Sequence, residues 1–181
     1  LIDKWKKYCQ KQAINNFTPL DETLIFSNME RKRENYSSRQ LGYPLERGEH
    51  SAWDRLLSVL YSEEEAHKIE WAIGSIVSGD SKWIQKFMVF YGSAGTGKST
   101  ILNIVQMLFE GYYAVFDARA LGSNNNSFAL ESFRSNPLVA IQHDGDLSRI
   151  EDNTKINSLV SHEEMTINEK FKSSYTNSFK A

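Results

Sequence analysis

A glycine-rich stretch in the middle of the chain constrains its fold more than any other feature. The sequence FMVFYGSAGTGKSTILNIV holds Gly92, Gly97, Lys98 and Ser99 in the spacing G-x-x-x-x-G-K-[ST], which is the pattern of a phosphate-binding loop, or Walker A motif. Glycines let the backbone curl so that successive N–H groups point at phosphate oxygens, and the following helix presents its positive N-terminal end. The alternative is a glycine-rich turn that binds nothing.

The residues around this motif have the alternating patterns of an α/β fold. Residues 85–92 (QKFMVFYG) form a continuous apolar run that predicts a strand covered on both faces. Ile101, Leu102, Val105 and Leu108 give the next helix a buried stripe. Further along, we expect strands at 112–116 and 137–143, a loop at 123–127 and a short helix at 128–135. Strands alternating with helices predict a parallel sheet.

The preceding residues divide into two parts. Trp53, Leu56, Leu57 and Leu60 recur at helical spacing, and a second apolar helical pattern runs from Ile69 to Gly79. We therefore expect a helical segment at 51–80 that packs by its apolar faces, before a core at 81–181. Residues 1–50 predict a linker or small subdomain that begins with a short basic helix.

The motif assigns roles to individual residues. Lys98 is expected to bridge the β- and γ-phosphates of ATP, and the Ser99 hydroxyl to contact Mg²⁺. The expected nucleotide-binding residues are Gly92, Ser93, Ala94, Gly95, Thr96, Gly97, Lys98, Ser99 and Thr100.

Hydrolysis also needs an acidic group at the end of a neighbouring strand. Asp144 and Asp146 follow the apolar residues 138–141, at the sheet edge where ligands bind. We expect Asp144 to hold Mg²⁺ and Asp146 to polarise water, so that the catalytic residues are Lys98, Asp144 and Asp146. The alternative is that HDGD is a simple turn.

The last part of the sequence predicts a helix at 152–160 and a hairpin or extended arm from residue 165. In this arm Lys170 and Lys172 alternate with Phe171 and Tyr175. Basic residues between aromatic ones are able to follow a nucleic-acid backbone and stack bases, so Lys170 and Lys172 are candidate nucleic-acid contacts. An ordinary solvated hairpin is the alternative.

Charge and cysteine content exclude several classes of protein. The net charge is −2, so nucleic-acid contacts must come from a local patch. A single cysteine, Cys9, and four scattered histidines exclude an internal disulfide and a typical zinc site. We find no apolar run long enough to span a bilayer and expect a cytoplasmic protein without membrane contact. Without an initial methionine, the sequence is interpreted as a piece of a longer chain.

Three blocks together resemble the primase-helicases of phages and poxviruses, which are superfamily 3 helicases with an AAA+ type P-loop NTPase core. The blocks are AWDRLLSVLYSEEEAHKIEWAIGSIVSGD, VFYGSAGTGKSTILNIVQMLF and LVAIQHDGDLSRIEDNTKINSLVSHEEMTINEKFK. They cover about two thirds of the chain, from Ala52 to Lys172. The family's acidic motif commonly has adjacent carboxylates, whereas Gly145 here separates Asp144 from Asp146.

This resemblance implies a homo-oligomeric ring, usually a hexamer, that hydrolyses ATP with Mg²⁺ between subunits and pulls single-stranded DNA through its pore. It assigns Lys98 and Ser99 to phosphate and magnesium, Asp144 and Asp146 to the acidic motif, and Lys170 or Lys172 to the pore hairpin. The family's sensor residue and arginine finger are expected beyond Ala181, so this segment should bind nucleotide better than it hydrolyses it.

The sequence leaves two alternative functions. The first is an ATP-dependent switch or assembly module that does not move along DNA. The second, a small-molecule kinase, is disfavoured because the acidic strand is followed by a helix and a lysine-bearing hairpin, and not by an arginine-rich lid.

Overall fold

The computed structural model describes residues 1–15, 24–30, 39–123, 126–145, 152–168 and 173–179. It divides the chain into two compact units, Leu1–Arg47 and Gly48–Ala181. Of the helices that it describes, none combines the length and the apolar character needed to cross a bilayer.

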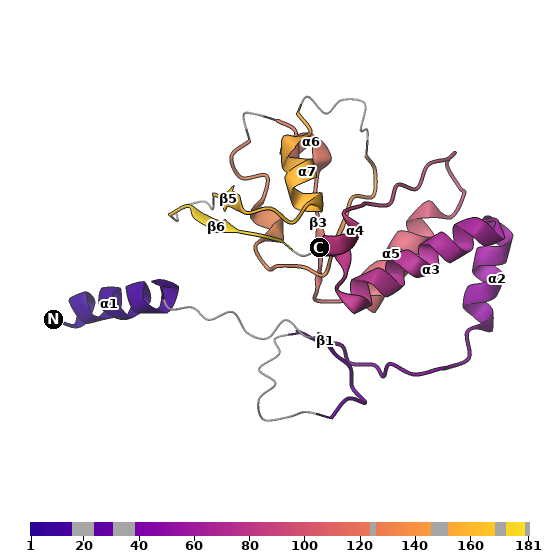
Figure 1. Ribbon diagram of the computed structural model, residues 1–181, viewed down its shortest axis with the longest axis horizontal. Helices are drawn as coiled ribbons and strands as arrows, with labels where there is room; N and C mark the ends of the chain where they lie inside the picture. Colours follow the sequence, from indigo (N-terminus) through magenta and orange to yellow (C-terminus); the bar gives the residue numbers. More distant parts are fainter. Residues whose placement is uncertain (16–23, 31–38, 124–125, 146–151, 169–172, 180–181) are drawn as a thin grey trace. The chain divides into compact units, whose positions relative to one another are not determined.

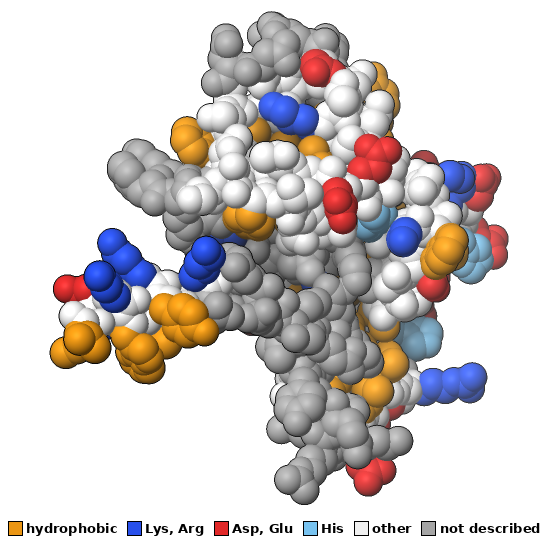
Figure 2. Space-filling view, turned by 60° about the vertical axis from the view of Figure 1, so that its left-hand side comes forward, with side chains coloured by type: hydrophobic (Ala, Val, Ile, Leu, Met, Phe, Trp, Pro, Cys, Tyr) orange, Lys and Arg blue, Asp and Glu red, His pale blue; other side chains and the backbone are white. Residues whose placement is uncertain are grey.

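The first unit contains a basic amphipathic helix and a small strand pair. Helix α1 (Ile2–Asn15) confirms the predicted helix, and Ile2, Trp5 and Tyr8 are exposed on it. Figure 2 shows hydrophobic side chains in orange on one side of α1 and basic side chains in blue on another. Strands β1 (Leu24–Ile25) and β2 (Arg39–Gln40) pair in parallel, a feature that the sequence pattern did not predict.

The second unit begins with two helices joined by a tight corner. Helices α2 (Ser51–Leu60) and α3 (Glu63–Ser78) confirm the predicted helical pair, and Gly79 ends α3 with a left-handed φ of 74°. Their apolar faces share a core with the helix that follows the glycine-rich loop, α5 (Lys98–Leu108). The buried members of this core are Leu57, Ile69 and Ile101. Figure 1 shows α5 close to α3, in agreement with this shared core.

A capping box fixes the corner between α2 and α3. The Glu65 backbone N–H donates to Ser62 Oγ over 3.3 Å, and the Ser62 N–H donates to Glu65 Oε2 over 2.8 Å. Both backbone N–H groups are donors that the start of α3 would otherwise leave unpaired. The hydrogen bonds from Ser62 also lower the pKa of the Glu65 carboxyl.

Replacing Ser62 by alanine is expected to lower the free energy of unfolding by about 1 kcal/mol, because the N-cap acceptor is lost. Urea unfolding followed by circular dichroism measures this cost, with Ser58→Ala on the exposed side of α2 as the control. The pKa of Glu65 is lower in the folded state than in the unfolded state. The contribution of the Glu65 carboxylate to the free energy of unfolding is therefore fully present above the unfolded pKa and is lost as the pH falls through the folded pKa. The difference in the free energy of unfolding between wild type and Ser62→Ala should therefore become smaller as the pH is lowered. A difference that became larger at low pH would contradict this account.

The segment between α3 and the loop differs from the prediction. After α4 (Ser81–Ile84), Gln85 adopts a left-handed φ of 51°, and residues 86–91, all described, belong to neither helix nor strand. Phe87, Val89 and Tyr91 are exposed, so the predicted doubly covered strand at 85–92 is wrong for this structure. The physical reason is that an apolar β-branched run becomes a strand only beside a partner strand, and here β3 and β4 pair with each other.

The two strands after α5 form a parallel pair, as predicted. Strand β3 (Tyr113–Val115) pairs with β4 (Val139–Ile141), and Ala114 lies opposite Ala140. Between them lie α6 (Ala118–Leu121) and a short 3-10 helix, η1 (Glu131–Phe133). The predicted helix at 128–135 is thus reduced to one turn, because Asn136 takes a positive φ of 49° and Pro137 follows it.

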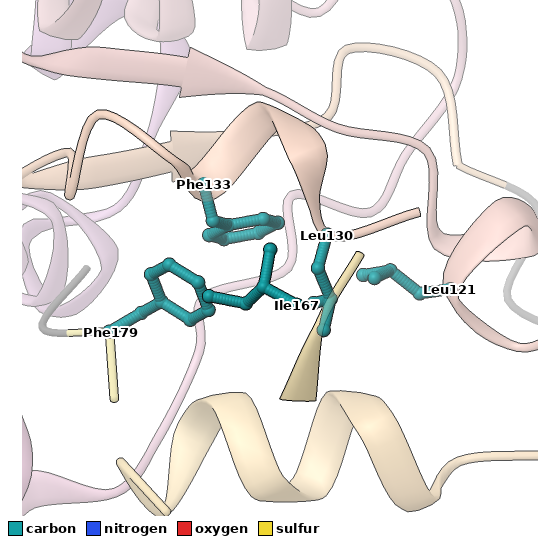
Figure 3. Packing of buried hydrophobic residues seen from close by; sticks show 5 residues of the cluster. All are labelled: Leu121, Leu130, Phe133, Ile167 and Phe179. Carbon is teal, nitrogen blue, oxygen red and sulfur yellow. The ribbon is translucent and has the colours of Figure 1, made fainter. Parts of the chain in front are cut away.

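The C-terminal elements close a second core. Helix α7 (Thr154–Val160) and the antiparallel strands β5 (Met165–Ile167) and β6 (Tyr175–Asn177) confirm the predicted helix and hairpin. Figure 3 shows the side chains that meet here, which are Leu121, Leu130, Phe133, Ile167 and Phe179. Each is at most 6% exposed. The small parallel pair is therefore held by α6, η1, α7 and the hairpin through one apolar cluster.

Candidate phosphate-binding site

The glycine-rich loop has a backbone that only glycines adopt easily. Gly92, Gly95 and Gly97 have φ values of 153°, 79° and 77°. Any other L-residue would be strained at these angles. Gly97 is the residue directly before α5, so the last left-handed turn of the loop leads straight into the helix. Local sequence therefore sets the shape of the loop.

The ammonium group of Lys98 is held inside this loop. Its Nζ donates to the carbonyl oxygens of Gly92 and Ser93 over 2.9 and 2.5 Å, and to Thr96 Oγ1 over 3.1 Å. Thr96 Oγ1 in turn donates to the Ser93 carbonyl over 2.9 Å. An ammonium group has three N–H donors, so the loop uses all of them. A fixed positive charge thus lies within the curl of the backbone.

The first turn of α5 adds further donors at the same place. The first backbone hydrogen bond of the helix runs from the Ile101 N–H to the Gly97 carbonyl over 3.1 Å. Helix geometry leaves the N–H groups before it without partners inside the helix, and the dipole makes this end positive. Ser99 and Thr100 are exposed in this turn. Together with Lys98, these groups form a site suited to an anion with several oxygens.

The predicted acidic residues follow β4, where the strand ends at Ile141. Asp144 is exposed, and its backbone carbonyl accepts a hydrogen bond from Gln142 Nε2 over 3.2 Å. The neighbouring His143 contacts α5 through its Nε2, which lies 3.0 Å from Gln106 Nε2. The end of β4 is therefore attached to the helix that follows the loop.

This attachment is distant from the loop. Gln106 follows Ser99 by seven residues, which is about 10 Å along the axis of an α-helix. Within the described part of the chain, the structure gathers Lys98 with Gly92, Ser93 and Thr96, and it shows no hydrogen bond between Ser99 and Asp144. The expected magnesium site, Ser99 with Asp144, stays a prediction.

Three predicted site residues, Asp146, Lys170 and Lys172, lie outside the described residues, so their roles also stay predictions. Among the described side chains, no group of three or more His, Cys, Asp or Glu is placed to hold a metal ion.

Sequence reasoning missed two side chains at the carboxyl edge of the strand pair. Asp117, which follows β3, accepts a hydrogen bond from the Arg119 N–H over 2.9 Å and caps α6. Gln142, which follows β4, accepts from the Ala118 N–H over 3.1 Å. A signal was available for Asp117, which comes directly after the strand predicted at 112–116, because parallel strands end at the same edge. Gln142 lay inside the strand predicted at 137–143, and only the earlier end of β4 at Ile141 places it at this edge.

Comparison with protein-family models finds a match to residues 90–181, just over half of the chain. The chain belongs to DUF5906, a family of unknown function. The DUF5906 region begins at Phe90 and includes the loop, α5 and every later element, whereas α2 and α3 precede it. No curated protein and no solved structure matches the chain.

Proposed function

We propose that the chain binds the triphosphate of ATP in the loop from Gly92 to Ser99, as the nucleotide-binding part of a replicative DNA helicase. The observation that carries this proposal is the Lys98 ammonium, held by the loop carbonyls at the start of α5. A cation, free helix N–H groups and glycines with positive φ meet there. This combination favours phosphate over other ligands.

A triphosphate is expected to displace one existing contact of Lys98. The bond to Thr96 Oγ1 is the longest of the three and has a neutral hydroxyl as its acceptor. A phosphate oxygen carries a negative charge, so its hydrogen bond with an ammonium is stronger. Lys98 would then keep its two carbonyl contacts and turn its third donor to the β- and γ-phosphates. Ser99 would hold the Mg²⁺ that accompanies ATP, which neutralises phosphate charge.

The motor hypothesis adds partners to this site. We propose that Asp144 and Asp146 complete the site for hydrolysis, and that Lys170 and Lys172 contact single-stranded DNA in a homo-oligomeric ring in the cytoplasm. The resemblance to superfamily 3 primase-helicases supports this choice, with an α/β P-loop NTPase core of the AAA+ type as the proposed fold. The parallel pairing of β3 and β4 is compatible with such a core.

A second candidate is an ATP-dependent switch or assembly module without translocation. The position of the acidic strand end favours it, because β4 meets α5 at Gln106, about two helical turns from Ser99. Such an arrangement would leave phosphate binding intact, because the end of β4 is attached to α5 through His143 and Gln106 and not at the first turn of the helix.

Steady-state ATP hydrolysis by the longest natural chain that contains this segment separates the two candidates. Under the motor hypothesis, turnover rises with single-stranded DNA, vanishes in Lys98→Ala and loses its DNA stimulation in the Lys170→Ala, Lys172→Ala double variant. Lys68→Ala, which removes an exposed charge on α3, serves as the control. Turnover that is indifferent to DNA would contradict the motor and favour the switch.

A further inference from the structure

The corner between α2 and α3, residues 60–62, lies against both ends of the loop. At the end of the loop that leads into α5, the side chain of Leu60 fills the space next to Gly97. A Cβ placed on Gly97 would lie 3.1 Å from Leu60 Cδ2 and 3.3 Å from Cγ, and it would overlap Cδ1. Gly97 is therefore required for its close packing against Leu60 as well as for its positive φ.

At the near end, the corner contacts the residues that lead into the loop. The Tyr61 ring packs edge-on against Phe90, with 6.4 Å between the ring centroids and 65° between the planes. Phe90 precedes Gly92 by two residues. Two adjacent residues of one corner thus contact both sides of the loop. Leu60 contacts Gly97, directly before α5, and Tyr61 contacts Phe90, two residues before Gly92.

The corner is itself held firmly. The Tyr61 N–H donates to the Leu57 carbonyl over 2.8 Å at the end of α2, and the Ser62 capping box begins α3. The Tyr61 hydroxyl is buried and has no hydrogen-bond partner among the described residues. Burial, with a smaller effect of the Glu65 carboxylate, raises the pKa of this phenol. The ring is therefore kept at this position by packing and not by its polar group.

We propose that this corner is a part of the phosphate-binding site, with Leu60 as its positioning residue. The inference rests on the proposed nucleotide binding and adds to it. The loop N–H groups converge on a phosphate only if Phe90 and Gly97 are held at a fixed separation, and the corner contacts both. Because α2 and α3 precede residue 90, nucleotide affinity then depends on residues outside the DUF5906 region.

The test is the dissociation constant of Mg·ATP, measured by isothermal titration calorimetry on the full chain at a temperature where each variant is folded. Leu60→Ala is expected to weaken binding by about tenfold, since displacing a positioning group by a fraction of an ångström is costly. Leu60→Met, which keeps the side-chain volume, should restore most of the affinity. Val59→Ala, one position earlier at an exposed site, should bind as wild type does.

A structural control separates positioning of the loop from general stability. Ile69→Val removes one methylene from the cluster of Leu57, Ile69 and Ile101, to which Leu60 and the loop glycines do not belong, so it should lower the thermal midpoint and leave affinity unchanged. Wild-type affinity in Leu60→Ala, or equal weakening in Ile69→Val, would overturn the positioning role alone. A wild-type chain that binds no Mg·ATP would overturn the proposed function, and this inference with it.

Discussion

Replacing Lys98 by alanine is expected to weaken Mg·ATP binding by on the order of 100-fold, about 2.7 kcal/mol. The loss combines two effects, because the variant lacks both the positive charge inside the loop and a charge-assisted hydrogen bond to phosphate. All hydrogen bonds of the ammonium lie within the loop, so the helices and strands should be unaffected. Isothermal titration calorimetry measures the affinity, and far-UV circular dichroism checks the fold.

The matched control for this loss is Lys68→Ala, which removes the same charge from α3. Lys68 is exposed and pairs at 2.6 Å with Glu64 of the same helix, and its hydrogen bond involves no residue of the loop. The affinity of the Lys68→Ala variant for Mg·ATP should equal that of wild type. Equal weakening in both lysine variants would contradict a specific role of Lys98 and indicate a general effect of net charge.

Replacing Phe133 by alanine is expected to have the largest effect on stability, about 3–5 kcal/mol less free energy of unfolding. Phe133 is 2% exposed and lies between two aromatic rings, with 5.7 Å between its ring centroid and that of Phe116 and 5.3 Å to that of Phe179. Truncation removes these contacts and leaves a cavity in the cluster of Figure 3. Urea unfolding followed by circular dichroism measures the loss.

Phe128→Ala is the comparison for this prediction, since Phe128 is 45% exposed and lies just before η1. Its cost should stay within about 0.5 kcal/mol, as for other surface substitutions. If Phe133→Ala were as stable as Phe128→Ala, the apolar cluster around Phe133 would not be the core that holds α6, η1 and the hairpin together.

Elements with a strong local pattern could be predicted from the sequence, and elements that depend on a distant partner could not. Helices α2, α3 and α5 carry apolar residues at helical spacing over two or more turns, and the hairpin β5–β6 alternates. The run at 85–92 has an equally strong strand composition, but a strand needs a neighbour to accept its hydrogen bonds. The parallel pair β1–β2 is only two residues long and has no period to detect.

The same distinction applies to the candidate site. The contacts of Lys98 with Gly92, Ser93 and Thr96 span at most six residues, so they form within the motif that the sequence identifies. The motif predicted a phosphate contact for Lys98, and its hydrogen bonds inside the loop came from the structure. The positions of Asp144 and Leu60 depend on how β4 and the α2–α3 corner pack against α5. No local spacing encodes such packing, which is why the role of Leu60 came only from the structure.

Backbone amide NMR of the ¹⁵N-labelled chain during titration with Mg·ATP tests the central claim most directly, because it reports both binding and its location. Our account predicts a saturable titration with its largest shifts at the N–H groups of Gly95, Gly97, Lys98 and Ser99, and no such shifts in Lys98→Ala. No saturable shift in wild type, or saturable shifts confined to residues outside the loop and the start of α5, would contradict it.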